Sequence, residues 1–190
     1  MTSIERDVQY DERLDLRTDL YPATTTEQRG TVLLIHGGGW FRGDKSKETK
    51  AASIFADAGY QVVVPNFRLA PDYLYPAPLV DMDSLVTWLR QSGRIDDHVA
   101  VVGASSGGNM SVEVGLKYGW PAVSLSGIIN IEEWLAAHPD VVGTLAHQRP
   151  LTLTPRLLIR MGPTMNSTRA LSSNTLVLLR STTSARRTTT

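Results

Sequence analysis

The sequence has 190 residues, of which 42% are hydrophobic and 20% charged, and its 19 basic and 19 acidic residues give a formal net charge of zero. This length suits one domain with a core of its own, and the balanced charge excludes a general attraction to nucleic acid or to a membrane surface. With no cysteine, disulfides and thiolate chemistry are excluded, while a polar N-terminus and the lack of a run of about 20 apolar residues predict no signal peptide, no membrane span and a cytoplasmic location.

The first half of the chain predicts buried strands separated by a helix. Residues 6–21 alternate loosely between apolar and polar side chains, which indicates one or two short strands. Residues 31–35 (TVLLI) form an apolar run of strand length, rich in branched side chains, that ends at a glycine loop at 36–40. Helical periodicity follows at 47–58, and a second apolar run (QVVVP) predicts a strand at 61–65.

The second half continues this alternation. A loop with prolines at 66–75 precedes an amphipathic helix at 78–90. Strands are predicted at 98–103 and 122–129, and helices at 106–118 and 131–137. Short apolar strands that alternate with helices predict an α/β fold, with a mostly parallel central sheet and helices on both faces. Because ligands bind at the carboxyl ends of such strands, we expect the glycine loop and Ser105 to share one crevice.

The segment Gly103-Ala104-Ser105-Ser106-Gly107 matches the pattern G-x-S-x-G between a predicted strand and a predicted helix. In that context the pattern predicts a sharp turn, in which the serine has a strained backbone and an exposed hydroxyl at the positive end of the helix. Ser106 is a rival nucleophile, but only Ser105 has glycine both two residues before it and two residues after it. The alternative is a glycine-rich turn that binds a phosphate at the helix end.

The second motif is the loop His36-Gly37-Gly38-Gly39-Trp40. Glycines let backbone N–H groups approach a substrate without side chains in the way, and esterases build an oxyanion hole from such a loop and the N–H after the nucleophile. We therefore expect the donors to be the amides of Gly37, Gly38 and Ser106, with a flexible turn as the alternative. His36 precedes the serine, whereas the base follows it in this arrangement, so we expect His36 to be structural.

Three segments together resemble the hormone-sensitive-lipase-like carboxylesterases of the α/β-hydrolase superfamily: HGGGW at 36–40, NFRLAPDYLYPAPLVD at 66–81 and GASSGGN at 103–109. The resemblance runs from about residue 30 to about residue 145. It implies an α/β-hydrolase fold and hydrolysis of short-chain carboxylic esters, small-molecule substrates, without a cofactor or a metal.

The resemblance also implies roles for individual residues. Ser105 would attack the ester carbonyl, and each oxyanion donor would contribute about 3 kcal/mol. The middle segment would support the glycine loop and position the helix behind it. Ala104 departs from the family, which usually has an acidic residue there. The remaining motif residues would support the site, namely His36, Gly39, Gly103, Gly107 and Gly108.

The acid and the base of a catalytic triad stay unassigned. After Ser105 the sequence has four carboxylates and two histidines, namely Glu113, Glu132, Glu133, Asp140, His138 and His147. Glu113 falls in the helix after the serine and is expected to point away from it, and no acid follows Asp140. Asp140 with His147 is one candidate pair, and the alternative for these two residues is a surface loop.

Residues 141–190 differ in composition from the rest, with no acid, no lysine, seven arginines and eleven threonines. Within them, 155–161 and 176–179 indicate two further strands. The composition is typical of a shifted reading frame, and we hypothesise that the native frame is lost near residues 145–150. The alternative is a natural basic tail, solvated or disordered. The chain therefore divides into a hydrolase core at 1–145, which is the nucleophile half, and an atypical tail at 146–190.

Two functional classes remain from the sequence. The first is a serine carboxylesterase, impaired because the triad acid and base are missing, and the second is a non-catalytic module that binds a small ligand on the hydrolase scaffold. A phosphatase or nucleotide-binding function is less favoured, because the glycine loop lacks the Lys-Ser/Thr pair of a P-loop. A sheet that is incomplete at its C-terminal side exposes an apolar edge, so we expect self-association into a homo-oligomer unless a partner covers that edge.

Overall fold

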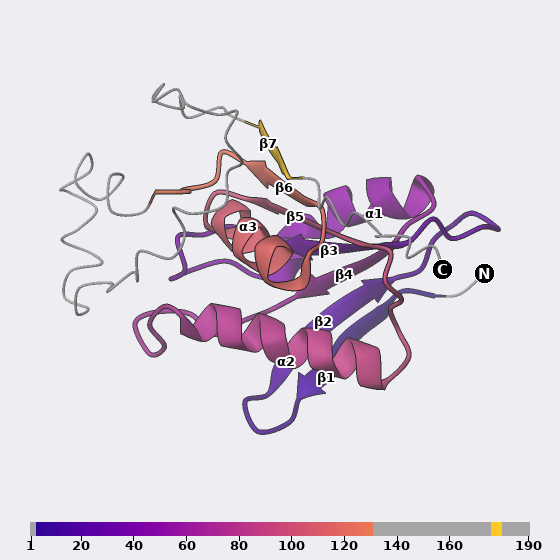
Figure 1. The fold of residues 1–190 in the computed structure, drawn as a ribbon. Coiled ribbons are helices and arrows are strands. Elements are labelled where there is room, and N and C mark those ends of the chain that lie inside the picture. The colour runs from indigo at the N-terminus through magenta and orange to yellow at the C-terminus, as the bar shows by residue number, and fades with distance from the viewer. Residues whose placement is uncertain (1–2, 131–175, 180–190) are drawn as a thin grey trace, which may run out of the picture.

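The computed structural model describes residues 3–130 and 176–179, and Figure 1 shows one sheet with helices on both faces. The strands are β1 (Glu5–Asp11), β2 (Leu16–Tyr21), β3 (Thr31–Ile35), β4 (Gln61–Pro65), β5 (Val99–Ala104), β6 (Ala122–Leu125) and β7 (Leu176–Leu179). The helices are a 3-10 turn, η1 (Lys45–Glu48), and three α-helices, α1 (Thr49–Asp57), α2 (Ala77–Gln91) and α3 (Ser106–Tyr118).

The sheet has seven strands in the order β1-β2-β4-β3-β5-β6-β7. Its centre, from β4 through β3 and β5 to β6, is parallel. At the edges, β1 pairs with β2, β2 with β4 and β6 with β7, and all three pairings are antiparallel. The predicted α/β fold is confirmed, with a parallel centre inside a mixed sheet.

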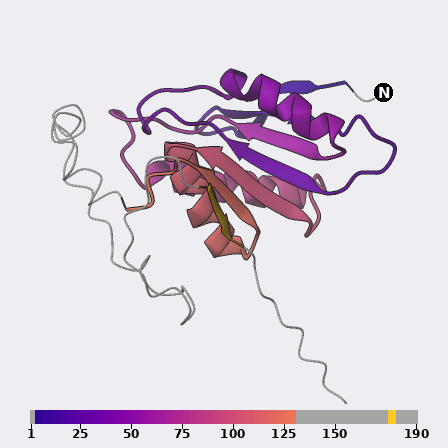
Figure 2. The same cartoon turned by 90° about the horizontal axis from the view of Figure 1, so that it is seen from above.

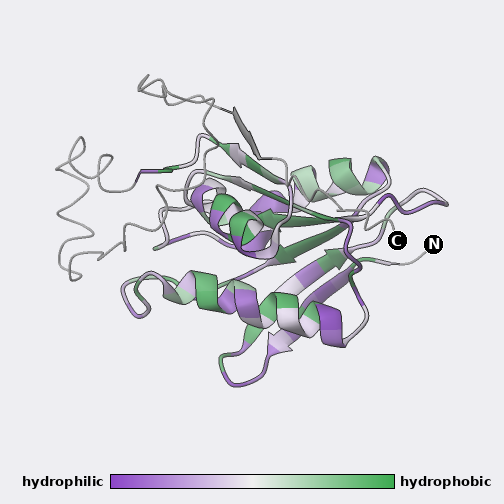
Figure 3. Cartoon of the chain, viewed as in Figure 1, coloured by the Kyte–Doolittle hydropathy of each residue, from purple (hydrophilic) through white to green (hydrophobic). Residues whose placement is uncertain are grey.

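The helices cover the two faces of the sheet unequally, and each face has its own core cluster. Figure 2 shows the sheet from above, with α1 on one side of it and α3 on the other. Alternate residues of β3 divide between these sides: Val32 and Leu34 belong to the cluster with α1, whereas Leu33 and Ile35 belong to the cluster with α2 and α3. A strand buried on both faces has consecutive apolar residues, as the green centres of β3 and β4 in Figure 3 show.

Most predicted bounds agree with the structure. The predicted strands at 31–35 and 61–65 and the predicted helix at 106–118 have the observed bounds, residues 6–21 contain two strands, and 176–179 is a strand. The helix predicted at 47–58 begins earlier, as η1. Residues 131–137, 155–161 and the boundary proposed between 145 and 146 lie outside the described residues. None of the described helices has both the length and the apolar character that crossing a membrane requires.

The strand predicted at 122–129 is too long, because β6 ends at Leu125. Ser126 has a φ of 48°, which turns the chain out of the strand. Gly127 then packs against α3, where a Cβ on it would lie 2.9 Å from the carbonyl carbon of Gly108. Ile128 is apolar because it packs against the core cluster, although it is not part of a strand.

Candidate active site

Ser105 occupies the single residue between β5 and α3, at the carboxyl end of the parallel strands. Its φ of 55° and ψ of −121° place a side-chain-bearing residue in a region that costs about 1–3 kcal/mol. The backbone is held on both sides, because the Ser105 N–H donates to the carbonyl of Leu125 (2.9 Å) and the Ser105 carbonyl accepts from the Asn109 N–H (3.1 Å). Ser105 and its neighbour Ala104 are both exposed, so the turn presents the Ser105 side chain to solvent.

Two glycines make this turn sterically accessible. A Cβ on Gly103 would collide with the carbonyl of Gly107, and a Cβ on Gly107 would collide with the carbonyl of Ile35 and lie 2.6 Å from the carbonyl oxygen of His36. These neighbours are backbone atoms that cannot rotate away. Strand β5, helix α3 and the end of β3 therefore approach one another more closely than any side chain at these two positions would allow.

Ser106, the rival nucleophile, is fully buried. Its Oγ accepts a hydrogen bond from the Gly39 N–H at 2.9 Å. The two adjacent serines therefore have different surroundings: the Ser105 side chain faces solvent, and the Ser106 side chain ties helix α3 to the glycine loop.

The glycine loop lies directly against the serine turn. A Cβ on Gly37 would lie 2.8 Å from the Ala104 carbonyl oxygen and 3.5 Å from the Cβ of Ser105. Gly38 has a φ of 133°, and its carbonyl accepts from the N–H of Arg42 at 3.1 Å, which closes the loop. The structure thus brings together the two motifs that lie almost seventy residues apart in the sequence.

His36 lies beneath this loop and is 1% exposed. Its ring stacks on Phe67, with centroids 4.2 Å apart, and its Nδ1 lies 2.8 Å from the carbonyl oxygen of Gly37. Burial lowers the pKa of His36 below its usual value. A buried, stacked ring of this kind supports the loop from below.

The middle motif, 66–81, also contacts the glycine loop. The Ala70 N–H donates to the Trp40 carbonyl at 2.8 Å. Arg68 binds Asp81 through its backbone N–H (2.8 Å) and its Nε (2.7 Å), and the Asp81 side chain is fully buried in α2. The motif therefore fastens the loop to α2, in agreement with the support that the resemblance implied.

The positive end of α3 points at the site. Ser105 is the N-cap residue and makes no side-chain capping bond, and the first N–H groups of a helix have no acceptor within the helix. The amide of Ser106, the first residue of α3, is therefore placed beside the exposed Ser105 side chain. Backbone donors at a helix N-terminus favour negative charge, which is what develops on a carbonyl oxygen under nucleophilic attack.

Among the described residues, no histidine hydrogen-bonds to the Ser105 side chain, and the buried His36 ring has its Nδ1 against the Gly37 carbonyl oxygen. His98 precedes β5 and is exposed, so that the length of the strand, about 20 Å for its six residues, separates it from the serine. Glu113 is half-buried in the second turn of α3, and burial raises its pKa. The candidate pair Asp140 and His147 lies outside the described residues. Among residues 3–130 and 176–179 no group of three His, Cys, Asp or Glu side chains could hold a metal ion.

A cluster of charged residues that the sequence did not predict lies next to the glycine loop. Lys45, which precedes the helix predicted at 47–58, is buried, and its ammonium lies 2.7 Å from the buried carboxylate of Asp19 in β2. The asparagine that opens the middle motif, Asn66, also belongs to this cluster because its Oδ1 accepts from the Lys45 N–H at 2.7 Å. The motif signalled Asn66, but no local pattern links Asp19 to Lys45.

Comparison with known proteins also identifies similarity to esterases. A family model described as BD-FAE matches residues 18–126, which is more than half of the chain. Carboxylesterase NlhH of Mycobacterium tuberculosis is 33% identical over 113 residues, covering 56% of this chain and 35% of the relative. The acetyl-hydrolase LipR of the same organism, whose assignment is provisional, is 26% identical over 138 residues, covering 70% of this chain and 44% of the relative. The chain thus spans well under half the length of these relatives.

Among solved structures, a bacterial heroin esterase is similar, with a TM-score of 0.53 and 25% sequence identity. The match covers 60% of this chain and 39% of the esterase. The described sheet and helices therefore correspond to part of an esterase fold.

Proposed function

Since the chain belongs to the BD-FAE family of α/β-hydrolase carboxylesterases, we propose that it hydrolyses short-chain carboxylic esters through an acyl-enzyme formed on Ser105. The observation that carries the proposal is the Ser105 turn: an exposed serine with a φ of 55°, followed by a helix and faced by the glycine loop. The substrate class follows from the esterases among the relatives. No cofactor is needed for this reaction.

In the proposed reaction, Ser105 Oγ attacks the ester carbonyl carbon and gives up its proton to a general base. The carbonyl oxygen becomes an oxyanion, which the amides of Gly37, Gly38 and Ser106 stabilise, each by about 3 kcal/mol. The C–O bond to the alcohol then breaks, and the alcohol leaves with the proton. Water next attacks the acyl-enzyme in the same way, which releases the acid and restores the serine.

The general base and its orienting acid are not assigned to any described residue. A site with its serine and oxyanion donors but without a base keeps a residual rate, roughly 10³-fold over water in serine proteases. That residual rate comes from the oxyanion donors and from substrate binding, and it does not require the serine. The proposal therefore predicts Ser105-dependent turnover if a residue outside the described part supplies the base.

The experiment compares the full chain with two serine variants, using p-nitrophenyl acetate turnover and labelling by a fluorophosphonate. In the labelling reaction the serine oxygen displaces fluoride from phosphorus. Ser105→Ala is expected to abolish the labelling and to lower turnover to the residual rate that the oxyanion donors sustain without a nucleophile. The matched control is Ser53→Ala, which removes an exposed serine of α1 whose hydroxyl donates to the Thr49 carbonyl of the same helix, and it should leave both signals unchanged. Label found on any serine other than Ser105 contradicts the proposal.

The second candidate function is binding of a small ester or acid without turnover, favoured because no histidine among the described residues hydrogen-bonds to the Ser105 side chain. It predicts no turnover above the Ser105→Ala background. Binding of butyrate, measured by calorimetry, would then persist in Ser105→Ala. Turnover that disappears with Ser105 rejects this candidate.

A further inference from the structure

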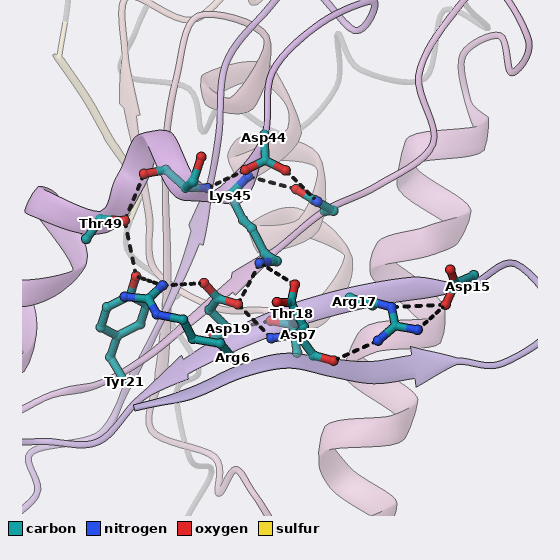
Figure 4. A network of polar contacts seen from close by, with 12 residues as sticks. Arg6, Asp7, Asp15, Arg17, Thr18, Asp19, Tyr21, Asp44, Lys45 and Thr49 are labelled. Carbon is teal, nitrogen blue, oxygen red and sulfur yellow. Dashed lines mark hydrogen bonds and ion pairs between the residues drawn. The ribbon is translucent and has the colours of Figure 1, made fainter. Parts of the chain in front are cut away.

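A lysine is buried five residues after the end of the glycine loop. Lys45 begins η1, and its side chain is only 9% exposed. As Figure 4 shows, its ammonium reaches between two carboxylates, 2.7 Å from Asp19 and 2.8 Å from Asp7. Asp19 is itself buried, and it also accepts from the Asp7 N–H (2.9 Å) and from the guanidinium of Arg6 (2.8 Å).

The Lys45 side chain stays charged in this setting. Burial alone would lower the pKa of Lys45, but its hydrogen bonds and charge interactions with Asp19 and Asp7 outweigh that effect and raise the pKa. Buried ion pairs add little net stability compared with apolar packing, and where they are retained they can fix one arrangement of the chain. The question is therefore which arrangement Lys45 fixes.

The backbone beside Lys45 is held as well. The Lys45 N–H donates to Asn66 Oδ1 (2.7 Å), and Asn66 Nδ2 donates to the carboxylate of Asp44 (2.8 Å). Asp44 also accepts from the Ser46 N–H at 2.8 Å. Since Asn66 directly follows β4, residues 44 and 45 are fastened to three strands: β1 through Asp7, β2 through Asp19 and β4 through Asn66.

Gly43, which directly precedes Asp44, packs against the glycine loop. Gly43 has a φ of 120°, and a Cβ on it would collide with the carbonyl oxygen of Gly37 and the ring of His36. Gly37 in turn lies against Ser105. Only Asp44 separates Lys45 from Gly43, so a displacement of Lys45 moves a residue that packs directly on Gly37.

We propose that Lys45, with Asp19 and Asp7, is a positioning clamp that sets where the donor amides of the glycine loop lie relative to Ser105. This inference rests on the proposed function of the Gly37 and Gly38 amides. Lys45 touches none of the reacting atoms. Its effect is geometric, because a misplacement of about 1 Å in a catalytic constellation costs on the order of 10²-fold in rate.

The test replaces Lys45 in the full chain and measures both the order of the glycine loop and the rate of ester hydrolysis. Lys45→Met keeps an unbranched side chain that is one atom shorter and removes its charge, whereas Lys45→Arg keeps the charge. The matched control is Lys117→Met, which breaks a surface ion pair to Asp83 (2.6 Å) at the far end of α3. Hydrogen–deuterium exchange of the 36–43 amides reports loop order, and steady-state kinetics with p-nitrophenyl acetate reports transition-state stabilisation.

For Lys45→Met we expect exchange of the 36–43 amides to speed up at least about tenfold, and kcat to fall at least about tenfold with KM within about threefold. Lys45→Arg should recover most of both, and Lys117→Met should match the wild type. Unchanged exchange together with kcat within twofold of the wild type, in a folded Lys45→Met protein, overturns the clamp.

Two further outcomes are separated by the design. If Lys45→Met does not fold, Asp7→Asn removes one of the two ammonium partners at an exposed position, and it must still accelerate exchange at 36–43 more than Lys117→Met does, or the clamp is rejected. If the wild type shows no Ser105-dependent turnover, the proposed function fails, but the exchange measurement still decides whether Lys45 orders the loop.

Discussion

The amide N–H of Gly39 donates to the hydroxyl oxygen of Ser106 at 2.9 Å, across 67 positions of sequence. This bond joins the glycine loop to the first residue of α3, directly beside the exposed Ser105. The chain thus uses one serine of the pair to hold the site together and presents the other to solvent. The consequence can be measured at each serine separately.

Replacing Ser106 with alanine should weaken the fold. The change leaves the Gly39 N–H without its acceptor, and we expect the free energy of unfolding to fall by about 1 kcal/mol. We also expect kcat to fall, since the loop loses its bond to α3. Urea unfolding measures the first effect, with Ser53→Ala as the control that should stay within a few tenths of a kcal/mol. Equal unfolding free energies for Ser106→Ala and Ser53→Ala would disprove the structural role of Ser106.

Replacing Ser105 with glycine should stabilise the protein while removing the nucleophile. A φ of 55° with a ψ of −121° is strained for serine and accessible to glycine, so about 1–3 kcal/mol of strain is relieved against about 0.5–1 kcal/mol of added backbone entropy cost. We expect a net gain of about 1 kcal/mol relative to Ser105→Ala, which keeps the strain. Thermal unfolding compares the two variants, and a lower midpoint for Ser105→Gly contradicts the strain.

The ion pair between Arg68 and Asp81 should contribute more to the free energy of unfolding than the surface pair that Asp83, on the same helix, makes with Lys117. Asp81 is fully buried and holds the guanidinium and the backbone N–H of Arg68, so Asp81→Asn is expected to cost about 3 kcal/mol. Asp83→Asn, which loses a surface pair to Lys117, should cost less than about 1 kcal/mol. Urea unfolding measures the free energy of unfolding of both variants. Similar losses for the two would contradict the prediction that the burial of Asp81 makes its ion pair more stabilising.

The burial of Glu113 predicts a dependence of stability on pH. Burial raises the pKa of Glu113, so the folded chain binds this proton up to a higher pH than the unfolded chain does. The stability contributed by Glu113 is therefore complete below about pH 4, the unfolded value, and declines as the pH rises through the folded value. Glu113→Gln should gain stability at pH 7 relative to the wild type and show no gain near pH 4.

The control for this prediction is Glu12→Gln, which makes the same substitution at an exposed position. Unfolding free energies at pH 4 and pH 7 give the difference for each variant. A gain for Glu113→Gln that is the same at both pH values would contradict the role of ionisation.

The parts of the fold that the sequence predicted are those in which local pattern and burial agree. Strands β3 and β4 are buried on both faces, so their apolar runs mark their ends without ambiguity. Helix α3 begins at the residue after Ser105 because the glycines on either side force the turn. The end of β6 was mispredicted because Ile128 is apolar for packing against the core, a tertiary reason that resembles strand pattern.

The candidate site divides in the same way. Glycine spacing indicated that 36–40 and 103–107 belong together, and contacts between Gly37 and Ser105 confirm their proximity. Asp19, in contrast, lies in a strand where polar residues are expected on the solvent face, yet it is buried. Its partner Lys45 is distant in sequence, and no local propensity encodes such a pairing.

The clamp around Lys45 also has a place in the order in which the chain is made. Lys45, its partners Asp7 and Asp19, and the Asn66 that holds its backbone all lie within positions 5–66, whereas the nucleophile is residue 105. Synthesis runs from the N-terminus, so the ribosome supplies every part of the clamp about forty residues before it adds the serine. The two donor amides of the glycine loop can thus be positioned on the nascent chain before the nucleophile and the third donor, the amide of Ser106, are added.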